Sequence, residues 1–158
     1  MSVRSNRARG LRFEAELARR LAALGVRSLP MSACRAGDLA VINSQIRIVE
    51  CKVVSGTRFT VRNHEQHALL TLLSSGGASF YYAVRFVTGP TTAEIRLFHI
   101  GSDSGPIYPV TGGYSLDQFA RHVRRHTKKA SGTAGLAAQL RVARNEIDKA
   151  LTVAEVSA

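Results

Sequence analysis

The 158-residue sequence predicts a single α/β domain. Three observations lead to this prediction: helical and extended patterns alternate along the chain, one central segment is apolar on both faces as in an internal strand, and 45% of the residues are hydrophobic. We expect the elements in the order α-β-β-β-α-β-β-α, followed by a helix in the C-terminal tail. No apolar run approaches the ~20 residues of a membrane span, so we expect no membrane contact.

The first part of the chain is predicted to form one helix and a strand hairpin. Residues 10–25 are expected to be helical and to end at Gly25, because apolar residues recur there at helical spacing: Phe13, Leu17, Leu21 and Leu24. Val26–Met31 is predicted as a short strand. Asp38–Ile42 and Ile46–Val54 are predicted as a hairpin around the polar loop 43–45.

The middle of the chain returns to strands after a second helix. A short extended piece is expected at 59–62, and Asn63 with Gln66 fits a capping box that starts a helix. The aromatic and β-branched residues of 79–87 predict a strong strand. Alternation over 94–100 predicts an edge strand.

The last part of the chain is predicted to be mostly helical. The Gly/Pro-rich stretch 101–113 is expected to be a loop, and Ser115 with Gln118 makes another capping box, which opens a helix. A linker follows at 130–135. Apolar steps of four and three residues then predict a final helix over 136–155.

The chain is strongly basic, with a formal charge of +11 and a pI of about 10.8. Residues 1–62 contain twelve Lys and Arg against four Asp and Glu, whereas residues 63–113 contain two against three. This uneven charge favours a polyanionic partner, most often nucleic acid, over a merely basic protein. No apolar signal segment and only two cysteines are present. We therefore expect a cytoplasmic protein, encoded by a cell or a virus and not secreted.

Three charged residues stand in the apolar hairpin: Asp38, Glu50 and Lys52. Side chains alternate along a strand, so Glu50 and Lys52 share one face and Cys51 belongs to the other, where we expect a core residue. A three-residue loop pairs Asp38 with Glu50, with Cβ atoms roughly 4.5–5.5 Å apart. Two carboxylates at that distance repel, and a divalent cation such as Mg²⁺ removes the repulsion. A two-residue turn would instead direct Asp38 to the Cys51 side.

Lys52 adds an ammonium group beside this carboxylate pair. Such a cation can stabilise charge developing on a phosphodiester or orient the attacking water, so the set suits phosphodiester hydrolysis by water that Mg²⁺ activates. The alternative is a buried carboxylate–lysine cluster that holds the hairpin together. On the first helix, Glu14 borders the apolar stripe, whereas Glu16 lies among arginines, where surface ion pairs are expected.

Asp38 followed by Glu50-Cys51-Lys52 resembles the (P)D-(D/E)xK signature of the restriction-endonuclease-like nucleases. The segments RGLRFEAELARRLAALG, GDLAV and IVECK resemble the archaeal-type Holliday junction resolvases more specifically, and this resemblance covers about residues 7–100. It implies an αβββαβ core with a central mixed β-sheet flanked by helices. The C-terminal helical extension is expected from the apolar spacing over 136–155 and not from the resemblance. We accordingly expect a nuclease domain over 1–127, then a linker and a C-terminal helix over 128–158.

The resemblance also implies a role for each site residue. Glu14, Asp38 and Glu50 are expected to be catalytic residues and metal ligands, and Lys52 the catalytic lysine. The expected cofactor is Mg²⁺, with Mn²⁺ able to substitute. The expected activity is that of a homodimeric endodeoxyribonuclease that resolves four-way DNA junctions by paired nicks. The tail helix lies outside the resemblance; it is expected to contact the second subunit or another protein, with packing on its own domain as the alternative.

Seven arginines are candidate DNA contacts: Arg4, Arg7, Arg9, Arg12, Arg35, Arg58 and Arg62. For the first four, a solvated basic arm is the alternative. His64 and His67 are expected to be exposed at the start of the second helix, and Tyr81 and Tyr82 to be sheet residues. Two other functions stay open: a related nuclease acting on duplex, flap or nicked DNA, and a non-catalytic DNA-binding protein of the same fold.

Overall fold

The computed structural model describes residues 3–31, 38–42, 46–62, 64, 67–68, 70–71, 79–101 and 107–125, and for residues 3–6 the backbone alone. The helices and strands of this part are α1 (Val3–Ala23), β1 (Ser28–Pro30), β2 (Leu39–Ile42), β3 (Ile46–Ser55), β4 (Arg58–Thr60), β5 (Ser79–Val87), β6 (Ala93–Ile100), β7 (Ile107–Pro109), β8 (Tyr114–Ser115) and α3 (Leu116–Arg125). None of the described helices is long and apolar enough to cross a membrane.

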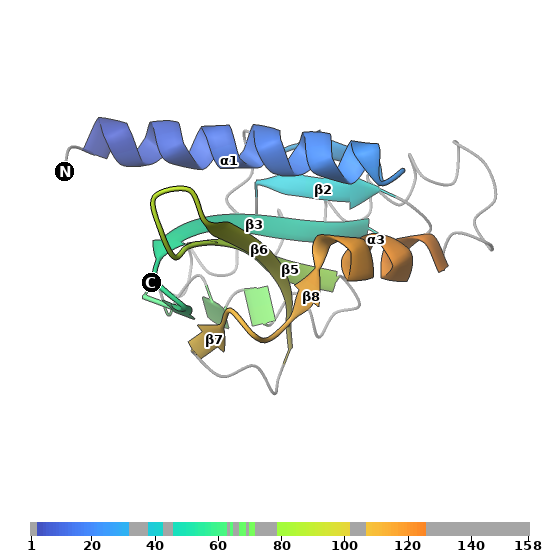
Figure 1. The fold of residues 1–158 in the computed structure, drawn as a ribbon. Coiled ribbons are helices and arrows are strands. Elements are labelled where there is room, and N and C mark those ends of the chain that lie inside the picture. The colour runs from blue at the N-terminus through green and yellow to red at the C-terminus, as the bar shows by residue number, and fades with distance from the viewer. Residues whose placement is uncertain are drawn as a thin grey trace, which may run out of the picture.

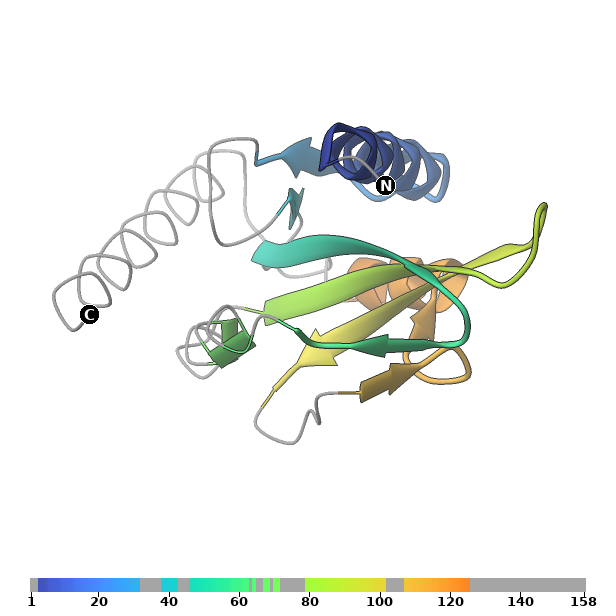
Figure 2. The ribbon, with the colours of Figure 1, turned by 90° about the vertical axis from the view of Figure 1, so that its left-hand side faces the viewer.

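Six strands form one large sheet, in the order β1-β2-β3-β5-β6-β8, and β4 pairs with β7 in a small second sheet. β3 and β5 run parallel, whereas the other neighbours in the large sheet run antiparallel. The sheet is therefore mixed, and it lies between helices on one face and the β4–β7 sheet on the other (Figure 1, Figure 2). The predicted α/β class and mixed central sheet are confirmed.

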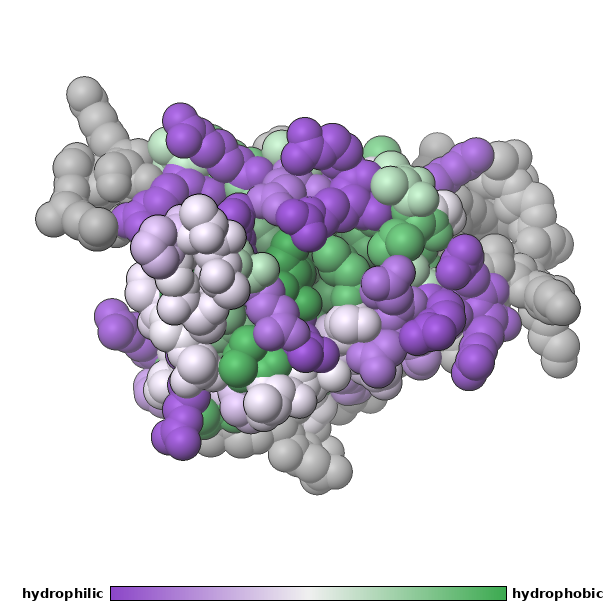
Figure 3. Space-filling model, in the orientation of Figure 1, coloured by the Kyte–Doolittle hydropathy of each residue, from purple (hydrophilic) through white to green (hydrophobic). Residues whose placement is uncertain are grey.

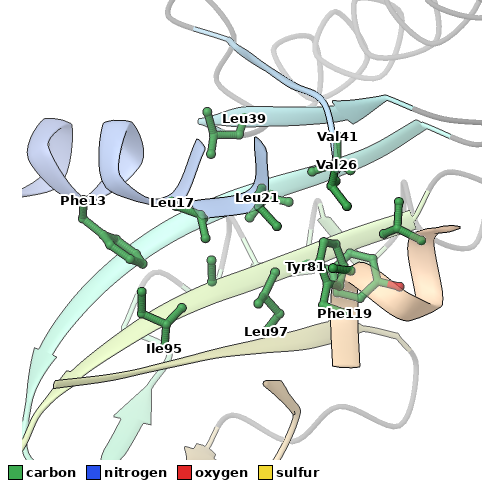
Figure 4. Packing of buried hydrophobic residues seen from close by; sticks show 14 residues of the cluster. Phe13, Leu17, Leu21, Val26, Leu39, Val41, Tyr81, Ile95, Leu97 and Phe119 are labelled. Atoms are coloured by element: carbon green, nitrogen blue, oxygen red, sulfur yellow. The ribbon is translucent and has the colours of Figure 1, made fainter. Parts of the chain in front are cut away.

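Two hydrophobic cores form on the two faces of the large sheet. On one face, α1 and α3 bury side chains against β2, β3, β5 and β6, as Figure 4 shows for Phe13, Leu17, Ile95, Leu97 and Phe119. On the other face, residues of β4, β7 and a short helical stretch pack on the sheet: Phe59, Tyr108 and Leu70 among them. Both faces of β3 and β5 are thus covered, which explains why their sequences are apolar on both sides.

The hairpin register matches the prediction along the length of β2. Ile42 pairs with Ile46 and Leu39 with Val49, as the three-residue loop requires. β2 begins at Leu39, however, and not at Asp38 as predicted. The N–H of Asp38 bonds to the carbonyl of Val49 (2.9 Å) instead of continuing the ladder opposite Glu50. The regular β2–β3 ladder therefore begins one residue after Asp38, which supplies the first carboxylate.

The first helix is longer than predicted at its start, and it ends at Ala23, two residues before the predicted Gly25. α1 begins at Val3, so the basic N-terminal segment is part of the helix. At its end, Gly25 has a positive φ of 72°, and its N–H bonds to the carbonyl of Ala22, while that of Val26 bonds to the carbonyl of Leu21. This pair of bonds is a Schellman motif, and glycine favours it because it has no Cβ to oppose a positive φ.

Two expectations for the second half were wrong. Residues 101–113, predicted as a loop, contain β7, which pairs with β4 about 50 residues earlier. A three-residue strand between glycines and prolines has too short a pattern to be recognised. β6, predicted as an edge strand, is covered at Arg96 and Leu97 by β8. β8 is only two residues long, so its pairing is likewise invisible in the sequence.

Other expectations for this half are confirmed or lie outside the described residues. Ser115 and Gln118 form the predicted capping box: the N–H of each bonds to the side-chain oxygen of the other, at 2.8 and 3.2 Å. The second helix is present at its described positions: His64, His67, Ala68, Leu70 and Thr71. Outside the described residues lie the capping box at Asn63 and Gln66, and the expected linker and tail helix of 128–158.

Candidate active site

The predicted site residues gather where β3 extends beyond β2. β2 pairs with β3 only as far as Val49, whereas β5 pairs with β3 up to Ser55. Among the described strands, the second half of β3 is therefore paired on one edge alone. Asp38 lies at the point where β2 begins, and Glu50 and Lys52 follow directly on β3. Side chains from both faces of the sheet can therefore meet at this open edge of β3.

Asp38 is held at this edge by a backbone hydrogen bond. Its Oδ2 accepts the N–H of Cys51 at 2.6 Å, which ties the carboxylate to β3. Partial burial, and then the charge of Glu50, raise the pKa of Asp38 to about 6, although the Cys51 bond opposes this rise. Glu14 contributes a smaller upward effect. The charges of both other predicted carboxylates, Glu50 and Glu14, therefore act on the pKa of Asp38.

Glu50 and Lys52 face the same side of β3 and form an ion pair. Lys52 Nζ donates to Glu50 Oε1 at 2.6 Å, and the Lys52 side chain is 33% exposed against 10% for Glu50. The neighbours on their face, Ile48 and Val54, belong to the core beneath β4, as the alternation predicted. The Lys52 side chain is thus partly exposed to solvent, whereas the Glu50 carboxylate to which it donates is largely buried.

The two glutamates of α1 have different surroundings, as expected. Burial, and then the charge of Glu50, raise the pKa of Glu14, so Glu14 belongs to the same acidic cluster as Asp38. Glu16 instead binds two cations: Arg20 one turn later at 2.7 Å, and Arg85 of β5 at 2.5 Å. The surface ion pair with Arg20 follows from the i,i+4 spacing. The sequence did not indicate Arg85, which lies 69 residues away.

The chemistry of this cluster fits a hard divalent cation. Asp38, Glu50 and Glu14 offer carboxylate oxygens, which are the ligands that Mg²⁺ prefers, and one or two of them normally suffice. Carboxylates that raise one another's pKa also gain from a cation that neutralises them. Within the described residues, no three His, Cys, Asp or Glu side chains lie close enough together to hold one ion. The observed fit is therefore one of charge and donor type.

A basic cavity adjoins Lys52 on the β4 side of the sheet. It has a volume of about 560 Å³, and its lining includes Lys52, Arg58, Arg62, Phe59 and Tyr82. Both arginines are exposed. Two of the predicted DNA contacts are thus next to the predicted catalytic lysine, in a cavity that no sequence pattern indicated.

The remaining arginine candidates lie along α1 or outside the described residues. Arg7, Arg9 and Arg12 are exposed, and Figure 3 shows hydrophilic residues along the outer side of this helix. The side chain of Arg4 and the whole of Arg35 lie outside the described residues. The N-terminal arginines therefore project from a helix and not from an extended arm.

Three polar pairs at or near the site were not predicted. His67, expected to be simply exposed, is partly buried; its Nδ1 lies 3.2 Å from the hydroxyl of Tyr82, and the rings stack. Arg47 is buried on the α1 face and hydrogen-bonds to Tyr81. The third pair is the contact between Glu16 and Arg85 described above. Each joins residues far apart in sequence, so no spacing rule could reveal it.

Cys51 is a core residue and not a nucleophile. It packs against the α1-side core, and burial, together with the neighbouring carboxylates, raises the pKa of its thiol. A thiol that is disfavoured as thiolate is a poor nucleophile. Tyr81 and Tyr82 are both buried in the sheet, as expected, and so offer no exposed ring for base stacking.

Comparisons with known proteins agree with the resemblance described above. The sequence profile of the archaeal Holliday junction resolvase family (Hjc) matches residues 5–127, which include Glu14, Asp38, Glu50 and Lys52. The fold is similar to that of Hjc, a Holliday junction resolvase from the archaeal hyperthermophile Archaeoglobus fulgidus. The TM-score is 0.54 and the identity 20%, over 72% of this chain and 96% of that chain. No curated protein matches the chain.

Proposed function

The chain belongs to the family of archaeal Holliday junction resolvases, and we propose that it cuts four-way DNA junctions by paired nicks in opposing strands, using a divalent metal ion. The observation that supports this most is the acidic cluster of Asp38, Glu50 and Glu14 with Lys52, at the open edge of β3 and beside a basic cavity. A protein that only binds DNA gains nothing from carboxylates placed next to the phosphates, because their charge repels the ligand.

The carboxylates would hold the metal ion. Asp38 and Glu50 would supply ligand oxygens, with Glu14 completing the acidic set; Mg²⁺ is the expected ion, and Mn²⁺ should substitute. Once bound, the metal supplies an activated water and stabilises charge on the phosphodiester. The Cys51 N–H keeps the Asp38 carboxylate directed along the open edge, so the site does not have to order this group when DNA arrives.

Lys52 would act on the scissile phosphate. Its ammonium is bonded to Glu50 and partly exposed, so it can reach a phosphate oxygen while it stays anchored to a ligand carboxylate. A preorganised cation of this kind stabilises charge that develops during the displacement. The arginines of α1, together with Arg58 and Arg62, would neutralise other phosphates, so affinity should fall steeply with salt, by several powers of ten between ~50 and ~200 mM.

We also propose that the active form is a homodimer. A junction is two-fold symmetric in outline, and two matched nicks require two identical sites at a fixed separation, which a two-fold dimer provides. Light scattering at micromolar concentration measures this directly. A monomer of 17.1 kDa that makes one nick per encounter would favour a general nuclease instead. A role for residues 136–155 in the dimer stays a prediction.

A cleavage gel tests the proposed function as a whole. Purified full-length protein is incubated with Mg²⁺ and a synthetic four-way junction, beside duplex, flap, nicked and single-stranded DNA of the same sequence. We expect symmetric nicks in the junction, little cutting of the other substrates, and no cutting in EDTA. Equal cutting of duplex and junction would identify a nuclease of another specificity, and binding without cutting a non-catalytic DNA-binding protein.

A further inference from the structure

The cavity beside Lys52 has a charged side that the catalytic step does not need. Its lining includes Arg58 on β4 and Arg62 just after β4, in addition to Lys52. Neither arginine makes an ion pair with a described residue, and no carboxylate is among the described residues that line the cavity. Two exposed guanidinium groups in a cavity whose described lining has no carboxylate are a good place for a phosphate.

The cavity also has an apolar side. Phe59 and Tyr82 meet edge to face with ring centroids 5.2 Å apart, and Val54 and Val61 add aliphatic surface. Tyr82 is fixed further by its contact with the His67 ring. Phe59, Tyr82 and Val61 are buried, so they form a rigid floor beneath the exposed arginines and offer little surface to a base. A volume of about 560 Å³ lies within the range of cavities that hold small ligands.

We propose that this cavity binds the phosphate of one nucleotide of the strand being cut, next to the scissile phosphate. Arg58 and Arg62 hold this phosphate, and the buried rings of Phe59 and Tyr82 form the floor of the cavity. Lys52 then marks the boundary between this nucleotide and the reacting one. The inference rests on the proposed function and adds to it a subsite that fixes the register of the strand relative to the acidic cluster.

The test uses junctions in which one phosphate at a time is a neutral methylphosphonate. Binding of the full-length protein is measured in EDTA, so the readout does not depend on cleavage, and the normal cut position is mapped separately with Mg²⁺. For the unaltered protein, we expect one methylphosphonate, adjacent to the cut, to weaken binding about tenfold, the effect of losing a charged hydrogen bond. For the double variant Arg58→Ala/Arg62→Ala, the same substitution should have no effect.

A matched variant controls for the loss of two charges. Arg121 and Arg124 are exposed on α3, which packs on the opposite face of the sheet. Arg121→Ala/Arg124→Ala should keep the tenfold effect at the adjacent phosphate. Thermal melts establish that each variant is folded. The variant Arg58→Gln/Arg62→Gln repeats the test with uncharged side chains that are longer than alanine.

Two outcomes would overturn the subsite. In one, the double variant weakens binding equally at every methylphosphonate position, so that the arginines act only as general charge. In the other, the sensitive phosphate lies several nucleotides from the mapped cut, away from Lys52. Failure of the proposed function would give a different result. Protein that binds junctions but cuts none of the DNAs with Mg²⁺ would refute catalysis. The binding data would still show whether Arg58 and Arg62 hold one particular phosphate.

Discussion

The two halves of β3 place charged residues in opposite settings. Arg47, in the half that is paired on both edges, is buried and bonded to Tyr81. Lys52, in the half that β2 does not reach, is bonded to Glu50 and partly exposed. Both cations interrupt the same apolar strand, but only one is available to a ligand. The position at which the neighbouring strand ends thus separates a buried, structural cation from the cation for which we propose a catalytic role.

The strongest test of this comparison removes the carboxylates at the boundary. Asp38→Asn and Glu50→Gln each delete the charge of a proposed metal ligand while they keep the size of the side chain and the arginines proposed to contact phosphates. We expect cleavage with Mg²⁺ to fall below detection and junction binding to stay within about tenfold. Cleavage at the original rate by either variant would show that the open edge is not the active site.

Replacing each of the two cations of β3 should affect different properties of the protein. Lys52→Ala should lower the cleavage rate ~10²–10³-fold, because a preorganised cation at the phosphate is lost. Its melting temperature should stay the same. Arg47→Met should keep cleavage per folded molecule and lose about 1–3 kcal/mol of stability, because Tyr81 loses a buried partner. Single-turnover rates and urea unfolding separate the two effects. A large stability loss for Lys52→Ala would instead support a structural ion pair.

Glu14 and Glu16 extend the comparison to α1. Glu14→Ala should slow cleavage by about tenfold or more, because it belongs to the acidic cluster. Glu16→Ala should leave the rate near its original value and lower stability modestly, by about 1 kcal/mol, since its partners Arg20 and Arg85 are partly exposed. Equal rates for the two variants would contradict the separation of the two helix faces.

The smallest expected effect concerns pH and the metal-free protein. The folded state binds the Asp38 proton more tightly than the unfolded chain, with a pKa of about 6 against 3.8. Stability should therefore fall as the pH rises from about 4 to 6, and Asp38→Asn should remove that fall. In EDTA at pH 7 we expect the variant to be about 1–2 kcal/mol more stable than the original protein, after allowance for partial exposure, and the difference to shrink towards pH 4.

Metal binding gives the matched control for this pH effect. Adding Mg²⁺ at pH 7 should raise the midpoint of unfolding of the original protein, because the ion binds the folded state alone. It should have little effect on Asp38→Asn. An equal rise for both would place the ion elsewhere on the protein.

The sequence predicted the elements whose patterns are long or whose ends have their own chemistry. The nine residues of β5 were predicted with the observed bounds, and the capping box of Ser115 placed the start of α3. β7 and β8 were missed, because strands of two or three residues are stabilised by partners distant in sequence. Local propensity does not encode such pairings.

For the site, alternation along β3 and the three-residue loop were enough to place Glu50, Lys52 and Asp38 in one neighbourhood. Both rest on local geometry, which a sequence specifies well. The ion pair between Glu16 and Arg85 and the cavity lined by Arg58 could not be predicted from the sequence. The first depends on how β5 packs and the second on how β4 packs. Contacts of that kind depend on the whole fold and not on spacing.

The parallel pairing of β3 with β5 has a consequence for the order in which the molecule folds. Arg47 pairs with Ser79, 32 residues later, whereas Ile42 pairs with Ile46 across a three-residue loop. Closing the short loop costs little chain entropy, so the hairpin can form within microseconds, and the distant pairing should limit the rate. The carboxylates of Asp38 and Glu50 are therefore expected to meet early, before the cavity that is proposed to receive the DNA strand has its floor.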